Sequence, residues 1–167
     1  METIFSTERL LFRKLQTEDA KNLYELNLDP DVIRYTGDQP FSSIVEAEDF
    51  IINYTAYTDY GIGRWAVIHK KTREFLGFCG LKYHPDENIV EIGFRFFKRY
   101  WNQGYATEAG KGAIAYGFTI MGYKEIYAHV HQNNDASKRV LEKIGLTFQK
   151  EIIYDGVPAF LYKIEKT

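Results

Sequence analysis

The sequence predicts a single α/β (α+β) domain spanning residues 1–167. Two kinds of apolar periodicity support this: the alternation typical of strands, concentrated after residue 63, and the three- and four-residue spacing typical of amphipathic helices. The 167 residues, 45% of them hydrophobic, suffice to bury a core without disulfides or metals. No internal repeat, linker or low-complexity segment divides the chain, so one domain is expected.

The N-terminal part of the chain is predicted to form one strand followed by helices. Thr17 is a candidate N-cap for the first helix, and Ser42 or Ser43 for the last one of this part. Between them, Asp29 and Pro30 interrupt the helical pattern, because proline disfavours the α conformation of the residue before it. The predicted elements are a strand at 9–15, helices at 18–28 and near 31–35, a loop at 36–41 and a helix from about 43 to 60.

From residue 63 the pattern changes to strands joined by short turns. Asn133 or Asn134 is the candidate N-cap of the last helix, and Gly145 ends it. Asp155 and Gly156 are expected to form the turn of a C-terminal hairpin. The predicted elements are antiparallel strands at 64–69, 75–83 and 88–97, a helix at 105–121, a strand at 125–131, a helix up to 145, and strands at 147–154 and 158–165.

The segment 91–115 holds the strongest functional signal. Its apolar residues alternate as in a strand, a polar turn follows, and small residues then recur at helical spacing from Ala106 onward. The first N–H groups of such a helix lack intrahelical acceptors and point, with the positive end of the helix dipole, at whatever precedes them. Gly104 lets the backbone approach a ligand closely, so the turn is a predicted anion site, with phosphate the favoured guest.

Three phosphate-binding motifs compete for this turn. A Walker-type loop needs a Lys-Ser/Thr ending, which the segment after Gly104 lacks. A dinucleotide fingerprint needs three glycines, and neither 61–63 nor 77–80 completes it. The acyl-CoA loop Q/R-x-x-G-x-G/A matches at Gly104 and Ala106 but has Trp101 in its first place. A plain glycine turn between a strand and a helix is the alternative.

A second motif lies at 134–146, where the sequence NDASKRVLEKIGL resembles the N-x-x-S-x-x-V-L-E-K-x-G-F signature of the GNAT acetyltransferases. With YWNQGYATEA at 100–109, it looks most like the branch of the ribosomal-protein N-terminal (Rim-type) acetyltransferases. The resemblance extends from about residue 7 to about residue 162, and its motifs are specific to the superfamily rather than to a substrate. It implies a mixed, mostly antiparallel sheet with about four helices, whose central strands splay apart at Glu91 and Tyr127.

The resemblance also implies how acetyl-CoA, as cosubstrate, would bind. The pantetheine arm would lie between the splayed strands, paired with the backbone of residues 94–96, and the amides of the turn would hold the pyrophosphate. Asn134 would bond the pantetheine end, with simple N-capping as its alternative role. The CoA-binding residues implied in this way are Phe94, Arg95, Phe96, Asn102, Gln103, Gly104, Tyr105, Ala106, Thr107, Asn134 and Ser137.

The implied chemistry is direct acyl transfer from a thioester to a primary amine. An amine attacks only when neutral, whereas an alkylammonium has a pKa of ~10.4, so a proton acceptor should help. Glu91 is the candidate base, with its pKa expected to be raised by nearby aromatic residues; a Glu91 that faces solvent or pairs with a lysine is the alternative. The tyrosine that serves many GNAT enzymes as proton donor is Leu141 here, so Ser137 is the candidate donor to the thiolate, besides water or unassisted departure.

The acceptor is left open by the sequence. A protein N-terminus and a small-molecule amine, such as a polyamine, an amino acid or an antibiotic, are both compatible with the motifs. Tyr35, Phe41 and Trp65 are candidates to line the acceptor pocket, with core packing as the alternative. A non-catalytic acyl-CoA-binding sensor or scaffold is the second functional class, and turnover would distinguish the two.

Composition argues against other classes. A net charge of −2 gives no electrostatic footprint for nucleic acid, and no apolar run approaches a membrane span. The single cysteine, Cys79, is expected to be buried and suits a reducing cytoplasm. His129 and His131 share a strand face, but no third ligand completes a metal site, so no metal is expected. An edge strand near residues 160–162 could pair with a second copy, giving a homodimer.

Overall fold

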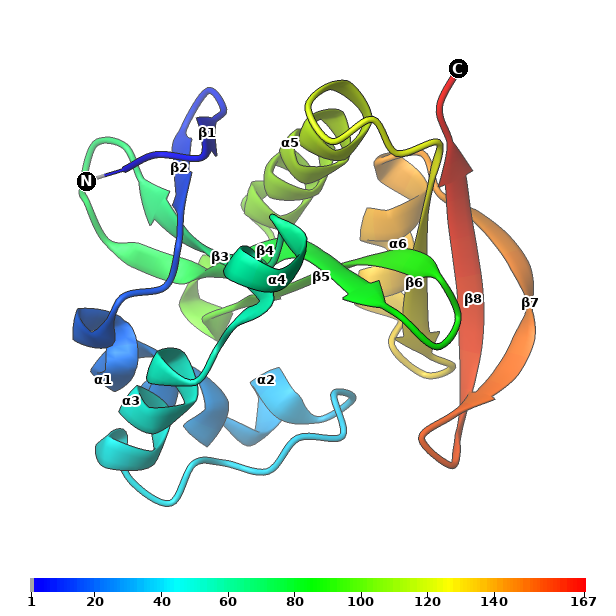
Figure 1. The fold of residues 1–167 in the computed structure, drawn as a ribbon. Helices are drawn as coiled ribbons and strands as arrows, with labels where there is room; N and C mark the ends of the chain where they lie inside the picture. Colours follow the sequence, from blue (N-terminus) through cyan, green and yellow to red (C-terminus); the bar gives the residue numbers. More distant parts are fainter. Residues whose placement is uncertain (1) are drawn as a thin grey trace.

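The computed structural model describes residues 2–167, which form one α/β domain around an eight-stranded sheet (Figure 1). The strand order is β1-β2-β3-β4-β5-β6-β8-β7, and every pair is antiparallel except β5 with β6. The strands are β1 (Phe5–Ser6), β2 (Leu10–Arg13), β3 (Arg64–His69), β4 (Phe75–His84), β5 (Ile89–Phe96), β6 (Glu125–His131), β7 (Thr147–Tyr154) and β8 (Val157–Glu165). The predicted mixed, mostly antiparallel sheet is therefore confirmed.

Among the described residues, four helices have nine or more residues and two are shorter, which agrees with the expected number of about four. They are α1 (Ala20–Leu28), α2 (Pro30–Ile33), α3 (Ile44–Ile52), α4 (Ala56–Tyr60), α5 (Tyr105–Thr119) and α6 (Asp135–Lys143), with 3₁₀ turns η1 (Thr17–Asp19) and η2 (Lys98–Tyr100). Within residues 2–167, none of the helices combines the length and apolar character needed to cross a bilayer.

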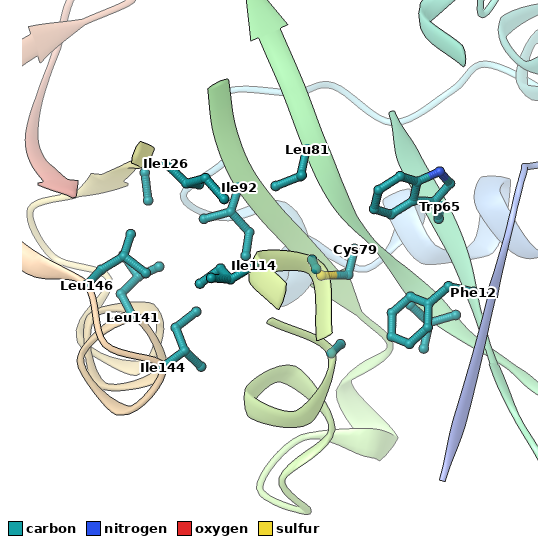
Figure 2. Close-up of a cluster of buried hydrophobic side chains, with 14 of the residues drawn as sticks. Phe12, Trp65, Cys79, Leu81, Ile92, Ile114, Ile126, Leu141, Ile144 and Leu146 are labelled. Carbon is teal, nitrogen blue, oxygen red and sulfur yellow. The ribbon is translucent and has the colours of Figure 1, made fainter. Parts of the chain in front are cut away.

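Two hydrophobic clusters cover the two faces of the sheet. Helices α5 and α6 pack over one face, where Ile114 and Leu141 meet Ile92, and Phe12 and Trp65 extend the same cluster toward β2 and β3 (Figure 2). Helices α1 and α3 pack together over the other face, on the side opposite α5 (Figure 1). Alternate residues of β3 supply both clusters, so this strand is buried on both sides.

The sheet opens between its two central strands. Parallel pairing of β5 with β6 is recorded at one position, Glu91 with Tyr127, whereas β5 pairs along its length with β4, and β6 with β8. Beyond Glu91, the two strands diverge and the facing edge of β5 is left without a neighbouring strand. The predicted splayed pair is confirmed, and Glu91 lies at the point of divergence.

Three of the candidate caps can be compared with the structure. The side chains of Ser43 and Asn134 accept hydrogen bonds from Glu46 N (3.1 Å) and Ser137 N (3.2 Å), so both act as predicted. Thr17 is not an N-cap, because a 3₁₀ turn precedes α1 and begins after Gln16. That turn forms because the Asp19 carboxylate folds back to the backbone N–H of Gln16, at 2.8 Å.

Two further expectations were wrong. The helix predicted from about 43 to 60 is divided into α3 and α4, since Tyr54 and Tyr57 turn toward β3 and bond the backbone of Arg64. The segment 160–162 is not an edge, because β8 pairs with β6 on one side and β7 on the other. The edge strand at this end of the sheet is β7, so strand pairing with a second copy there would use β7, while β1 is the edge at the other end. The two-residue strand β1 was not predicted.

A buried ion pair fastens β2 to the start of the helical layer. The Arg13 guanidinium donates to both carboxylate oxygens of Asp19, at 2.7 and 2.9 Å, and both side chains are buried. Removing one partner of such a pair leaves an uncompensated buried charge.

Replacing Asp19 with alanine should lower the free energy of unfolding by about 3–5 kcal/mol, the usual result of breaking a buried pair. Glu25→Ala is the control, because Glu25 pairs with Lys21 at 3.9 Å on an exposed face and should cost at most about 1 kcal/mol. Urea unfolding at neutral pH measures both. Equal losses for the two variants would contradict this role of the Arg13–Asp19 pair.

Candidate active site

The Glu91 carboxylate is buried at the divergence of β5 and β6 and contacts three basic side chains. Arg64 of β3 donates to its Oε1 at 3.1 Å, and His84 of β4 approaches the same oxygen with Nε2 at 3.2 Å. His129 of β6 contacts the other oxygen, Oε2, through Nδ1. Three strands thus bring side chains to a carboxylate that a fourth strand, β5, carries. A solvent-facing or lysine-paired Glu91, the alternative considered from the sequence, is wrong.

Glycine at position 93 makes room for this cluster. A Cβ atom there would lie 2.6 Å from a guanidinium nitrogen of Arg64, so a larger residue would push that group away. The guanidinium is also fixed by the carbonyls of Gly80 and Glu91, at 2.9 and 3.3 Å. The Glu91–Arg64 contact therefore depends on a glycine two residues along the same strand face.

The cluster keeps Glu91 ionised. Burial alone raises the pKa of a carboxyl group, but the hydrogen bonds from His129 and His84 and the charge of Arg64 outweigh it and hold the pKa of Glu91 well below its usual range. The expectation of a raised pKa was therefore wrong. The sequence showed the apolar surroundings of Glu91 but gave no indication that Arg64 would reach it.

A cavity of about 1100 Å³ opens beside Glu91. Both predicted catalytic residues, Glu91 and Ser137, line it, as do Phe94, Arg95 and Asn134 of the predicted CoA site. The loop between α2 and α3 lines its other side, where Tyr35 and Phe41 lie. Trp65 is only 1% exposed and belongs to the core, so the core-packing alternative holds for that residue.

The predicted anion site lies at the start of α5. Gly104 is its N-cap with a φ of 81°, a left-handed conformation that favours glycine. The first helical hydrogen bond runs from Glu108 N to Gly104 O at 3.0 Å, which leaves the amides of residues 105–107 without intrahelical acceptors. The segment 102–107 is not part of the lining of the cavity and lies just beyond the end of β5, after η2.

Arg9 was missed by the sequence analysis. Its guanidinium donates to Gln103 O (3.0 Å) and to the Glu108 carboxylate (3.1 Å), and it lies over the Tyr105 ring, 4.3 Å from the centroid. These contacts place a cation beside the turn and hold the turn in position. No local pattern could reveal them, because 94 residues separate Arg9 from Gln103.

Two further residues of the predicted CoA site, Phe96 and Arg95, make hydrogen bonds within the protein. The carbonyl of Phe96 accepts a hydrogen bond from the Trp101 indole at 2.9 Å, which ties the turn to the end of β5. The Arg95 guanidinium bonds Asn27 (2.8 Å) and Asp38 (2.7 Å), and so joins β5 to α1 and to the loop that follows α2. The sequence predicted only that the Arg95 backbone would pair with the pantetheine arm. It did not predict these side-chain contacts.

Two other sequence expectations concern possible reactive groups. Cys79 is fully buried, as predicted, and burial raises the pKa of its thiol to about 12. His129 and His131 do not act together, because His129 contacts Glu91 whereas Nδ1 of His131 accepts from Asn133 N at 3.0 Å. No group of three or more metal-ligating side chains suited to an ion was found among residues 2–167.

A strand that opens beside a buried cluster, followed by a helix whose first amides lack intrahelical acceptors, agrees with the acyl-CoA-dependent transferase that the sequence motifs imply. Residues 9–147 match the family model of the acetyltransferase (GNAT) domain, so the chain belongs to the GNAT acetyltransferase family. As a member, it is an acetyl-CoA-dependent N-acetyltransferase.

Individual relatives agree with this assignment. The uncharacterized N-acetyltransferase p20 of Bacillus licheniformis is 37% identical over 90% of this chain and 84% of that protein. A crystal structure of a GNAT-family acetyltransferase from Bacillus anthracis has a TM-score of 0.82 and 28% identity, covering 96% of both chains. The spermidine N(1)-acetyltransferase of Escherichia coli is 24% identical over 90% of this chain and 79% of that protein.

Replacing Glu91 with glutamine should destabilise the fold by about 3 kcal/mol at pH 7, because the amide leaves the Arg64 charge without its partner. The pKa of Glu91 is lower in the folded chain than the ~4.3 of an unfolded glutamate, so this stabilisation is present above that pH and lost as the pH falls. The difference in the free energy of unfolding between wild type and variant should thus persist from pH 7 to 5. It should narrow below about pH 4.

Urea unfolding across this pH range measures the gap. Glu87→Gln is the control, because Glu87 is exposed in the turn between β4 and β5 and should show no gap at any pH. A gap for Glu91→Gln that stays constant into strong acid would contradict the lowered pKa.

Proposed function

We propose that the chain transfers the acetyl group of acetyl-CoA to a primary amine by direct attack, with both substrates bound at once. The observation that carries the proposal is the opening between β5 and β6, where the free edge of one strand, a basic cluster around a carboxylate and a large cavity meet. The opening admits the thioester arm from one side and the amine from the other.

In this proposal, acetyl-CoA binds along the unpaired edge of β5 and over the start of α5. The backbone of residues 94–96 pairs with the pantetheine amides, and the amides of residues 103–106 hold the pyrophosphate, with Asn102 and Thr107 beside them. Support comes from the left-handed Gly104 and the free helix amides, which suit a phosphate group. Asn134 faces the cavity while capping α6, so its two candidate roles are compatible.

The acetyl group passes directly to the amine, without an acyl-enzyme intermediate. The one cysteine is buried and its thiol pKa is raised to about 12, so it does not supply a thiolate nucleophile. An N–H of the β5 backbone near Phe94 stabilises the developing oxyanion. Ser137 lines the cavity and is the proposed proton donor to the departing sulfur.

The acceptor class extends from small-molecule amines to protein N-termini. A small amine is supported by the cavity beside Glu91 and by the relationship to a spermidine acetyltransferase. A protein N-terminus is supported by the Rim-type motifs at 100–109 and 134–146. Acetyl-CoA-dependent thiol release against polyamines, aminoglycosides, amino acids and short peptides tests the function and names the acceptor class.

Release of CoA thiol with one acceptor class, matched by acetylated product in mass spectrometry, is the expected result. Binding of CoA by calorimetry without release for any amine would overturn the proposed transfer and favour the sensor alternative.

The proposed pyrophosphate site predicts a loss of CoA binding when Gly104 is replaced by glutamate. The new carboxylate would stand where the phosphates bind, and like charges ~4 Å apart repel strongly enough to weaken binding by at least about 100-fold. Calorimetric titration with CoA measures the effect.

Gly122→Glu is the matched control. Gly122 follows the opposite end of α5, has a similar φ of 73°, and has no neighbouring atom within 4 Å of an added Cβ. Net charge then changes equally in both variants, and both positions have a left-handed backbone. Similar CoA affinities for the two variants would contradict the anion site.

A further inference from the structure

We propose that His129 accepts the proton of the acceptor ammonium and that Glu91 is the positioning residue that orients its imidazole. This inference rests on the proposed acetyl transfer to an amine, and it changes the part played by Glu91. The basis is the geometry at the divergence of β5 and β6, where one carboxylate lies between two imidazoles of which one lines the cavity.

One ring nitrogen of His129 is hydrogen-bonded within the described residues, and the other is not. Nδ1 contacts Glu91 Oε2, and the hydrogen bonds of residues 2–167 leave Nε2 without a partner. The ring stacks on Tyr154, with centroids 4.3 Å apart and planes 17° apart, which fixes its plane. The side chain is nearly buried yet belongs to the cavity lining, together with Glu91 and Tyr154. Nε2 is thus the nitrogen that an amine in the cavity can reach.

His84 provides the contrast. It also contacts Glu91, with Nε2 at 3.2 Å, and its ring centroid lies 6.1 Å from that of His129. It does not belong to the lining of the cavity, although Lys82 and Tyr83 of the same strand do. Of the two imidazoles on Glu91, only His129 is therefore placed to meet a substrate.

The groups around His129 determine which of its nitrogens carries the proton. Arg64 of β3, His84 of β4 and Glu91 of β5 face it across the cluster, and Tyr154 of β7 covers its ring. Glu91 is held ionised, so it accepts from Nδ1–H and leaves the lone pair on Nε2. Burial and nearby Glu91 raise the pKa of Tyr154 to about 12, so that ring is uncharged at neutral pH.

The step conserves atoms and charge. The ammonium gives one proton to Nε2 of His129, and the freed lone pair of the amine attacks the thioester carbonyl carbon to form the C–N bond. The C–S bond then breaks, and its electron pair leaves on the CoA sulfur. Ser137 gives its hydroxyl proton to that sulfur and takes the second proton of the nitrogen in its place, giving the amide and CoA thiol, and the imidazolium returns its proton to solvent. While protonated, His129 is paired with the Glu91 carboxylate.

Two substitutions at position 129 separate catalysis from structure. In His129→Asn, the side-chain amide can replace the Nδ1–H donor to Glu91 but provides nothing in place of Nε2. In His129→Gln, the amide reaches toward the Nε2 position but cannot accept an ammonium proton. We expect both to lower kcat by about 10²–10⁴-fold, the usual contribution of a general base, with CoA affinity unchanged.

His84→Gln and Glu91→Gln are the comparison variants. His84→Gln should lower kcat by less than about tenfold, well under the loss at a general base. Glu91→Gln should lower kcat and move the acidic limb of the pH–rate profile without abolishing it, because the proposed proton acceptor, His129, is still present. Both His129 variants should lose the limb itself. A His129→Asn enzyme with near-normal kcat would overturn the proposal and leave His129 a structural role.

An acceptor that needs no deprotonation gives a second readout. A fluorinated analogue of the active amine is neutral at pH 7. With this analogue, the His129→Gln variant should lose much less of the wild-type rate than it loses with the parent amine. Equal losses for the two acceptors would overturn the proton-transfer role. A wild-type enzyme that acetylates no amine would instead refute the proposed function, so the two failures are distinguishable.

Discussion

The architecture of the site depends on one buried charge, the Glu91 carboxylate. A buried carboxylate is costly unless it is paired and hydrogen-bonded. Here Arg64 and two histidines supply those contacts from neighbouring strands, so β3, β4, β5 and β6 meet at one residue. The same residue is the recorded pairing point between β5 and β6. The interaction that holds the two halves of the sheet together therefore also marks where they separate.

The separation has two consequences for function. It frees the edge of β5, whose backbone groups need partners, and it admits the cavity that runs between the strands and the helical layer. The turn after β5 then delivers the chain to Gly104, where the amides of α5 point outward. The strand edge and the helix start are consecutive parts of one segment, and the strand of that segment also lines the cavity. That continuity explains why this segment also carries the strongest signal in the sequence.

Local chemistry could be predicted from the sequence, and long-range contacts could not. Periodicity located the longer strands and helices, and the caps Ser43 and Asn134 follow from side chains that bond the amide three residues away. Thr17 was misassigned because Asp19, which is also paired with Arg13, accepts from Gln16 N and so starts a 3₁₀ turn after Gln16. The Arg64, His84 and Arg9 contacts span 27, 7 and 94 or more residues, and only the folded sheet brings them together.

The direction of the Glu91 pKa shift illustrates why a residue's role could not be settled from its position alone. Aromatic surroundings favour a neutral carboxyl, whereas one guanidinium and two imidazole contacts reverse the balance. A carboxylate held that firmly in its ionised form is a weak proton acceptor but a good anchor for a neighbouring imidazole. Proton transfer and charge stabilisation are then divided between two residues on adjacent strands. The hydrogen bonds of the two imidazoles and the charge of Arg64 together keep Glu91 ionised, and so they determine that division.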